Sequence, residues 1–224
     1  MTSFIKVLDL GLIDYQTAYS IQTKVFQECY EGKSLDTLII QENTPIISLG
    51  KGSHQEHLLI NEDELKALGI DLVYADRGGD ITYHGPGQLV ISPILHLKRY
   101  TTSVHQYVRD LEEVVIRLLN RYQIAGYRIE GLSGVWVGSD KIAAIGIAVQ
   151  HGITRHGVSI NVNPDLAHYD YIIACGLKDR NITSFNKLGV QVNELSQIRD
   201  DFIAEFNQVF STESNQTDFM KGDI

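Results

Sequence analysis

The spacing of hydrophobic residues predicts helices at four places along the chain. Over residues 14–30 apolar side chains recur every three or four positions, and Asp14 is suited to cap the first turn. The clearest pattern covers residues 103–125, where an apolar stripe lies opposite a charged face and Gly126 follows. Residues 61–68 and 192–210 show the same periodicity over shorter or less regular stretches. We therefore expect helices in these four segments.

Short runs of apolar and β-branched residues predict strands between these helices. Residues 36–41 and 45–49 are separated by a turn-prone segment, so we expect these two strands to pair with each other. Pro93 lacks the backbone N–H that a central strand would use, which predicts an edge strand or a bulge. Turns containing glycine separate the last three runs and predict a meander. The expected strands are residues 4–10, 36–41, 45–49, 71–75, 89–96, 134–137, 141–150 and 152–162.

This order of elements predicts the fold class and the domain organisation. Strands in adjacent runs, mixed with several helices, indicate an α/β or mixed α+β architecture. No internal repeat and no linker-like run divides the 224 residues, so we expect one domain over residues 1–210. Residues 211–224 are polar, and we expect a flexible tail there that forms no further element.

Composition and charge exclude several classes of function. The chain is 43% hydrophobic and 21% charged, as is typical of globular domains. Its net charge of -9 disfavours binding to nucleic acid, which needs a concentrated basic face. No apolar run approaches the roughly 20 residues that cross a bilayer, and the N-terminus lacks the pattern of a secretion or import signal. We expect a cytosolic protein with neither nucleic acid nor a membrane as partner.

Residues 77–88, RGGDITYHGPGQ, concentrate glycines beside one arginine and one histidine. Glycine permits positive φ and lets backbone N–H groups approach a ligand closely. Arg77 adds a fixed positive charge, and His84 could exchange a proton near neutral pH. The segment matches neither a phosphate-binding loop nor a dinucleotide fingerprint. It is either a ligand-binding segment or a long hairpin connection with ordinary turn glycines.

The two cysteines, Cys29 and Cys175, lie far apart and fit no disulfide or metal-binding spacing, so we expect no metal and no cofactor. Cys175 precedes a glycine at the end of an apolar run, where an exposed thiol could act as a nucleophile. By residue type alone, a lone cysteine is more often an inert core residue, and Cys29 receives that interpretation. Lys141 opens another apolar segment and either stabilises a thiolate or is an ordinary solvated lysine.

The order of these motifs resembles the octanoyltransferases of lipoate biosynthesis, the lipoate-protein ligase B family. RGGDITYHGPGQLV is similar to the signature of that family, and GVWVGSDKIAAIGIAV, RHGVSINVN, IIACGL and NITSF follow in the same order. The similarity extends from about Leu8 to about Phe210. Two positions depart from the family pattern: Ala174, where many relatives have proline, and Asn43, where histidine is common. Neither departure removes a reacting group, although Ala174 leaves the approach to the cysteine less rigid.

The resemblance implies a fold and residue roles. The fold would be the α/β fold shared with biotin and lipoate ligases, a single domain with a mixed sheet covered by helices. Cys175 would be the acyl-thioester nucleophile, and Lys141 would favour its thiolate and assist proton transfer. The implied acyl-substrate contacts are Arg77, Gly78, Gly79, Asp80, Ile81, Thr82, Tyr83, His84, Ala144, Ile145, Gly146, Gly157, Val158 and Ser159.

The implied reaction transfers an octanoyl or lipoyl group from acyl carrier protein to a lysine of a lipoyl domain. Such domains occur in 2-oxoacid dehydrogenase complexes and in the glycine cleavage H protein. No ATP is needed, because amide formation from a thioester is downhill. The acidic carrier protein calls for a local basic patch, for which Arg77, Lys98, Arg99 and Arg109 are the candidates.

Two alternatives to acyl transfer remain open. An ATP-dependent lipoate or biotin ligase on the same fold would activate a free acid and would need no nucleophilic cysteine. A non-enzymatic scaffold could bind a lipoyl domain through the same loops.

Overall fold

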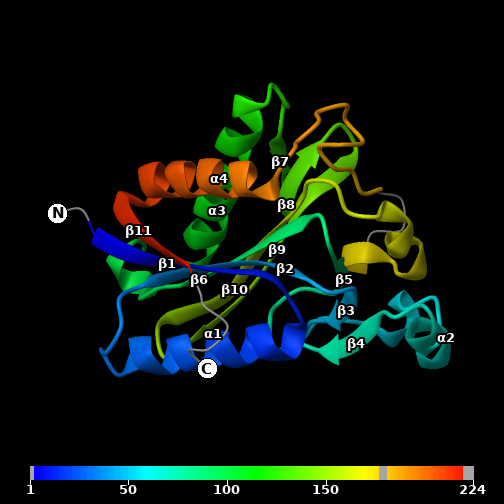
Figure 1. The fold of residues 1–224 in the computed structure, drawn as a ribbon, viewed down its shortest axis with the longest axis horizontal. Coiled ribbons are helices and arrows are strands. Elements are labelled where there is room, and N and C mark those ends of the chain that lie inside the picture. The colour runs from blue at the N-terminus through cyan, green and yellow to red at the C-terminus, as the bar shows by residue number, and fades with distance from the viewer. Residues whose placement is uncertain (1–2, 177–180, 219–224) are drawn as a thin grey trace.

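The computed structural model describes residues 3–176 and 181–218, which form two β-sheets with helices on both faces of the larger one (Figure 1). Helix α1 (Tyr15–Tyr30) covers one face, and α3 (Val104–Arg121) and α4 (Leu195–Phe210) cover the other. The short α2 (Glu62–Ala67) lies beside the smaller sheet. In spatial order the larger sheet contains β11 (Thr212–Asp218), β1 (Ser3–Ile13), β2 (Thr37–Asn43), β6 (Gln88–Ile94), β10 (Ile153–Asn161), β9 (Asp140–Gln150), β8 (Leu132–Val137) and β7 (Tyr127–Ile129), and the smaller contains β4 (Asp71–Tyr74), β3 (Ile46–Leu49) and β5 (Ile81–His84).

Capping residues explain where the helices begin. The side chains of Asp14 and Ser103 each accept a backbone N–H from the first turn of α1 and α3. Asn61 and Glu64 form a reciprocal capping box at the start of α2. All four expected helices are confirmed, with ends within a few residues of the predicted ones. Among the described residues, no helix is long and apolar enough to cross a membrane.

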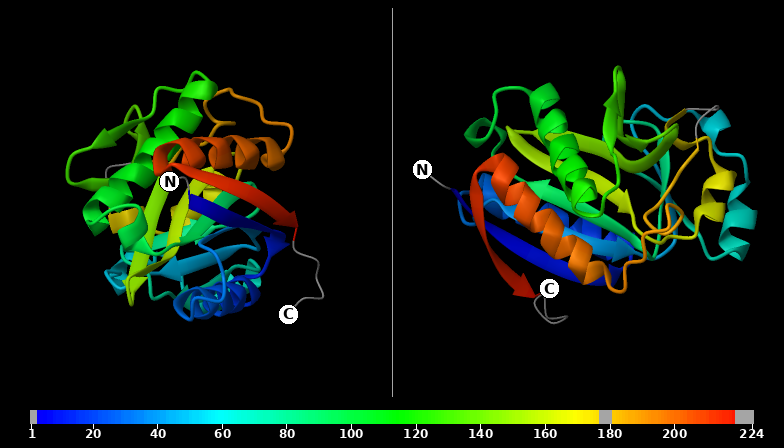
Figure 2. Two further views of the ribbon diagram at one scale, coloured as in Figure 1. Left: turned by 90° about the vertical axis from the view of Figure 1, so that its left-hand side faces the viewer. Right: turned by 90° about the horizontal axis from the view of Figure 1, so that it is seen from above.

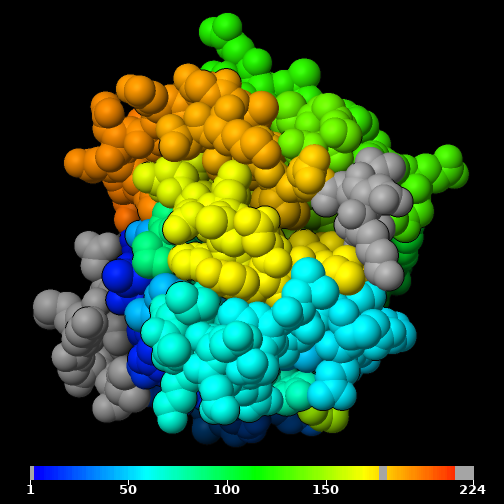
Figure 3. All heavy atoms as spheres, turned by 90° about the vertical axis from the view of Figure 1, so that its right-hand side faces the viewer, coloured from blue at the N-terminus to red at the C-terminus, as the bar shows by residue number. Residues whose placement is uncertain are grey.

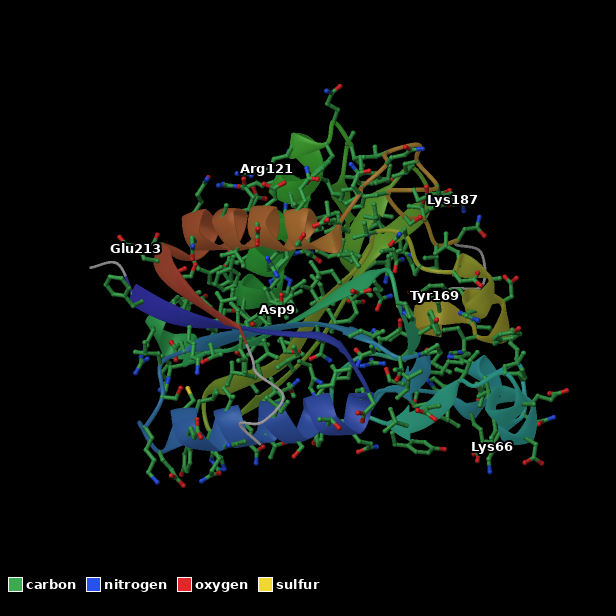
Figure 4. The ribbon with its side chains drawn as sticks, in the orientation of Figure 1. Asp9, Lys66, Arg121, Tyr169, Lys187 and Glu213 are labelled. Carbon is green, nitrogen blue, oxygen red and sulfur yellow. The ribbon has the colours of Figure 1, made fainter. Side chains whose placement is uncertain are left out.

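The largest hydrophobic core lies between the larger sheet and the pair α3 and α4. The apolar stripe of α3, which includes Leu111, Val115 and Leu118, is fully buried against the inner face of the sheet. Arg121 of α3 is paired with Glu205 of α4 at 2.7 Å, which fixes the two helices beside each other (Figure 4). A second core lies under α1, and a third lies under the smaller sheet. The predicted mixed α/β domain is therefore confirmed.

Two expectations about strand pairing are wrong. Residues 36–41 and 45–49 do not pair, because β2 joins β1 and β6 in the larger sheet while β3 joins β4 and β5 in the smaller one. Pro93 of β6 lies opposite Leu38 of β2, and β6 is a central strand and not an edge. The ladder between β6 and β10 ends at Ile91 opposite Val158, so the missing N–H of Pro93 interrupts no pair there. The expected meander is confirmed as β8, β9 and β10.

The expected flexible tail is wrong for Thr212–Asp218. These residues form β11, which pairs in parallel with β1 from Ser3 to Asp9 (Figure 2). An edge strand is held mainly by backbone hydrogen bonds, so a polar sequence does not prevent it from forming. Residues 219–224 lie outside the described part of the chain.

Candidate active site

The segment 77–88 folds into a tight loop followed by strand β5. The guanidinium of Arg77 is buried beneath this loop and donates hydrogen bonds to the carbonyls of Ser48, Gly78 and Asp80 at 2.7, 3.1 and 2.8 Å, and to the Ser48 hydroxyl at 2.8 Å. Loss of solvent lowers the pKa of Arg77 from its ordinary value. Arg77 therefore fastens the loop to β3, a use of its planar fork that lysine cannot reproduce.

The loop lies directly on strands β9 and β10. The N–H of Gly78 donates to the Ile147 carbonyl of β9 at 2.8 Å. A Cβ atom on Gly146 would lie 3.0 Å from the Gly78 oxygen, and one on Gly157 would lie 2.2 Å from the Ile91 oxygen. Gly157 therefore leaves no room for a side chain between the strands, and a side chain at Gly146 would push the loop away from β9.

Cys175 lies in a left-handed turn at the edge of this loop, with φ 56° inside η4 (Ala174–Gly176). Its thiol is partly exposed, and the buried Lys141 at the start of β9 brings Nζ to 3.2 Å from the sulfur. The backbone of Lys141 is held by Asn181 and Thr183, which follow the cysteine turn in sequence. The structure thus brings together the two sequence-predicted reactive residues.

Neighbouring groups direct the Lys141 amine towards the sulfur. The Nζ atom lies 4.7 Å from the centre of the Trp136 ring, whose face attracts a cation. A Cβ atom on Gly134 would lie 3.3 Å from Lys141 Cε and 2.5 Å from the Ala143 oxygen, so the missing side chain at this position makes room for the lysine. An amine buried in this way needs polar partners, and the thiol is one of them.

Cys175 and Lys141 line a cavity of about 220 Å³ beneath the loop. The sequence-predicted contact residues Gly78 and Tyr83 are not part of its lining. Tyr83 instead belongs to the core of the smaller sheet, where its hydroxyl lies 2.8 Å from His168 Nδ1. The other predicted contact residues all line the cavity: Arg77, Gly79, Asp80, Ile81, Thr82, His84, Ala144, Ile145, Gly146, Gly157, Val158 and Ser159.

Several polar residues that the sequence did not indicate as site residues also line the cavity. Gln41 and Tyr15 each carry a buried polar atom, Oε1 and the hydroxyl, without a hydrogen-bond partner among the described residues. A bound molecule or water can satisfy these atoms. The signal in the sequence was a polar residue at an apolar position of a helix or strand, as with Gln22 in α1. The missed polar residues are Tyr15, Gln22, Gln41, Asn43, Ser48, Ser92, Ser133 and His156.

His84 does not exchange protons near neutral pH, contrary to the expectation from its residue type. Loss of solvent, with the nearby charge of Arg77, lowers the pKa of His84 to about 4. Its Nδ1 lies 2.6 Å from Gln88 Oε1. The amide nitrogen of Gln88 is engaged with Asn161 and with Tyr169, which Figure 4 labels. The network therefore assigns the proton to Nδ1 of a neutral imidazole and leaves Nε2 as an acceptor.

Cys29 is fully buried, in agreement with the inert interpretation. Its sulfur lies 3.3 Å from His96 Nδ1 and 3.5 Å from Asp36 Oδ1. Burial and the neighbouring Asp36 carboxylate raise the pKa of this thiol to about 12. The three side chains lie close enough together to hold a metal ion, but Asp36 is already bonded to His96 and Tyr100 and paired with Arg99.

The arginines expected to form a docking patch are buried or paired. Arg77 lies beneath the loop. Arg99 lies 3.2 Å from Asp36, and Arg109 lies 2.8 Å from Glu112. These three residues therefore do not provide an unpaired basic surface.

The match to a protein family agrees with this geometry. Residues 14–213 match the lipoyl protein ligase A/B catalytic domain, and the chain belongs to this family. Octanoyltransferase of Chloroflexus aurantiacus is 44% identical over 208 residues, which is 91% of this chain and 93% of the relative. Octanoyltransferase of Caldanaerobacter subterraneus subsp. tengcongensis is 40% identical over 217 residues, covering 96% of this chain and 94% of the relative.

Solved structures share the fold at low sequence identity. A Thermoplasma acidophilum protein with bound lipoic acid superposes with a TM-score of 0.75 at 17% identity, covering 99% of this chain and 91% of that one. A lipoate-protein ligase A bound with ATP gives a TM-score of 0.76 at 16% identity, with coverage of 99% and 90%. The biotin protein ligase of Aquifex aeolicus gives 0.58 at 14% identity, with coverage of 92% and 70%. The expected biotin and lipoate ligase fold is confirmed.

Proposed function

We propose that this chain is an octanoyltransferase that carries the acyl group as a thioester on Cys175. The observation that carries the proposal is the 3.2 Å approach of Lys141 Nζ to the Cys175 sulfur in the lining of the cavity. An amine at this distance stabilises a thiolate when protonated and accepts a proton when neutral. The identity to octanoyltransferases over most of the chain supports the same activity.

In the first half-reaction, the Cys175 thiolate attacks the carbonyl carbon of an octanoyl thioester. A new carbon–sulfur bond forms, and the bond to the donor sulfur breaks. The donor leaves as a free thiol after taking a proton from the Lys141 ammonium. This step produces octanoyl-Cys175 and a neutral Lys141.

In the second half-reaction, the acceptor lysine enters as an ammonium and gives one proton to the neutral Lys141. The resulting amine attacks the octanoyl carbonyl, the bond to Cys175 breaks, and the cysteine leaves as a thiolate. The new amide nitrogen releases its second proton to water. The thiolate and ammonium of the resting pair are thereby restored, and no ATP is consumed.

The lining of the cavity supports binding of a medium-length acyl chain. Ile81, Val90, Ile145 and Val158 contribute apolar side chains to this lining. Burial of each CH₂ group contributes about 0.8 kcal/mol to binding. The alkyl chain would therefore bind along β9 and β10, with its carbonyl at Cys175.

The proposed donor is octanoyl-acyl carrier protein, and the proposed acceptors are lipoyl domains of 2-oxoacid dehydrogenase complexes and the glycine cleavage H protein. The proposed location of this reaction is the cytoplasm. The mechanism requires no metal and no cofactor.

A transfer assay tests the proposal against an ATP-dependent ligase on the same fold. The protein is given a lipoyl domain with either octanoyl-carrier protein alone, or octanoate and ATP. Lipoyl-domain octanoylation from the carrier protein without ATP is the expected result. Modification only with octanoate and ATP, undiminished in Cys175→Ser, would instead establish a ligase.

A further inference from the structure

Asp80 is the only acidic residue among the described residues that line the reactive cavity. Its Oδ2 atom lies 2.6 Å from His57 Nδ1, and both side chains are largely buried, with 12% and 13% exposed. Its Oδ1 atom accepts the N–H of Ile81 at 2.7 Å. A carboxylate has about four acceptor positions, so this geometry leaves others for a ligand.

The pair formed by His57 and Asp80 lies against the nucleophile turn. A Cβ atom on Gly176, the residue after Cys175, would lie 2.8 Å from Asp80 Oδ2 and 3.1 Å from His57 Cε1. The segment that carries His57, η1 (Gln55–His57), is hydrogen-bonded to the chain just before the cysteine, because Ile173 N donates to the His57 carbonyl at 2.8 Å. Figure 3 shows this face, where the cyan segment that includes η1 adjoins the yellow segment that ends in the turn.

A carboxylate at this place opposes the formation of a thiolate, because like charges repel strongly where water is scarce. Apart from His57, no basic side chain of the described site has a hydrogen bond or ion pair to the carboxylate oxygens. Arg77 donates to the backbone carbonyl of Asp80 and not to its side chain, and Lys141 is directed at Cys175. The Asp80 carboxylate disfavours the first half-reaction. We therefore expect it to bind a cationic substrate in the second half-reaction.

We propose that Asp80 binds the ammonium group of the acceptor lysine and that His57 is a positioning residue that holds the carboxylate in place. This inference rests on the proposed function, since an amine acceptor is its second substrate. A lysine is cationic at pH 7, with an unperturbed pKa of about 10.4. Asp80 accepts hydrogen bonds from this ammonium beside Cys175, where Lys141 then takes one proton.

The test separates the two half-reactions in the full-length protein. Octanoyl-enzyme is formed from octanoyl-carrier protein, isolated, and mixed with either a lipoyl domain or hydroxylamine, a nucleophile that is uncharged at neutral pH. Asp80→Asn preserves the shape of the side chain and removes its charge. Asp63→Asn, on the exposed first turn of α2, is the matched control.

Loss of the charged hydrogen bond should slow transfer to the lipoyl domain about 10- to 100-fold in Asp80→Asn, mainly through a higher KM for the lipoyl domain. Octanoyl-enzyme formation should be as fast as in the wild type or faster, because the carboxylate no longer opposes the thiolate, and the reaction with hydroxylamine should not slow. His57→Ala should reproduce the loss, and His57→Asn, which keeps a donor near the Nδ1 position, should restore part of it. Asp63→Asn should leave all three rates unchanged.

Equal slowing of acylation, hydroxylamine reaction and lysine transfer in Asp80→Asn would assign Asp80 a structural role. That result would overturn this inference and leave the proposed octanoyltransferase function in place. Unchanged lysine transfer in both Asp80→Asn and His57→Ala would overturn it as well. If one variant fails to fold, as judged by its melting temperature, the other still decides between these outcomes. Wild-type protein that forms no octanoyl-enzyme would instead overturn the proposed function, and this inference with it.

Discussion

Lys141 and Cys175 are coupled through the backbone as well as through their 3.2 Å side-chain contact. Residues 181–183 lie alongside β9, where Asn181 O accepts the Lys141 N–H and Thr183 N donates to the Lys141 carbonyl, both at 3.0 Å. The backbone of Lys141 is therefore bound to residues that follow Cys175 closely in sequence.

Replacing Lys141 tests its role in the chemistry. Lys141→Gln should slow formation of octanoyl-Cys175 about 10²- to 10⁴-fold, because it removes both the cation and the proton carrier. Stopped-flow or quenched-flow acylation measures this rate. Lys66→Gln, which alters an exposed lysine on α2, is the control and should acylate normally. A Lys141→Gln rate close to the wild-type rate would remove Lys141 from the mechanism.

Two glycines of the meander provide a matched pair for the placement of Lys141. Gly134 and Gly138 both have positive φ, but only at Gly134 would a Cβ atom meet the backbone of β9 and the lysine side chain. Gly138→Ala should cost about 1 kcal/mol of the free energy of unfolding, from its left-handed conformation. Gly134→Ala should cost about 3 kcal/mol or more, since it adds overpacking, and should also slow acylation. Urea denaturation and acylation rates measure both effects, and equal behaviour of the two variants would contradict this packing.

The lowered pKa of His84 predicts a dependence of stability on pH. The folded-state pKa is about 4, below the ordinary value of 6.5, so the unfolded chain binds more protons between these values. The contribution of neutral His84 to stability is therefore fully present above about pH 6.5 and is lost as pH falls towards 4. His84→Asn should flatten this part of the curve of unfolding free energy against pH. A His84→Asn curve with the same slope as the wild type would contradict the assignment.

Much of the fold could be predicted where the information is local. Apolar periodicity located α1 and α3, and Asp14 indicated the start of α1, because helix hydrogen bonds join residues close in sequence. The partner of a strand is a distant segment, and the sequence of β2 and β3 therefore did not reveal that they enter different sheets. Strand β11 escaped prediction because its backbone, rather than an apolar side-chain pattern, holds it to β1.

The candidate site shows the same difference between features set by local sequence and features set by long-range contacts. Residues 77–84 form one contiguous motif, and most of them line the cavity as expected. Tyr15 and Gln41 come from separate elements and belong to no motif, so only the fold brings them to the cavity. The buried role of Arg77 also depended on the fold, because its partner Ser48 lies on β3, 29 residues earlier in the chain.

Intact-protein mass after incubation with octanoyl-carrier protein, without ATP or a lipoyl domain, shows whether Cys175 carries the acyl group. We expect one added octanoyl group on the wild type, located at Cys175 by peptide mapping. Cys29→Ser, which alters the buried thiol, should acquire the same group, and Cys175→Ser should acquire none. An unmodified wild type, or an octanoyl group that persists in Cys175→Ser, would contradict the claim.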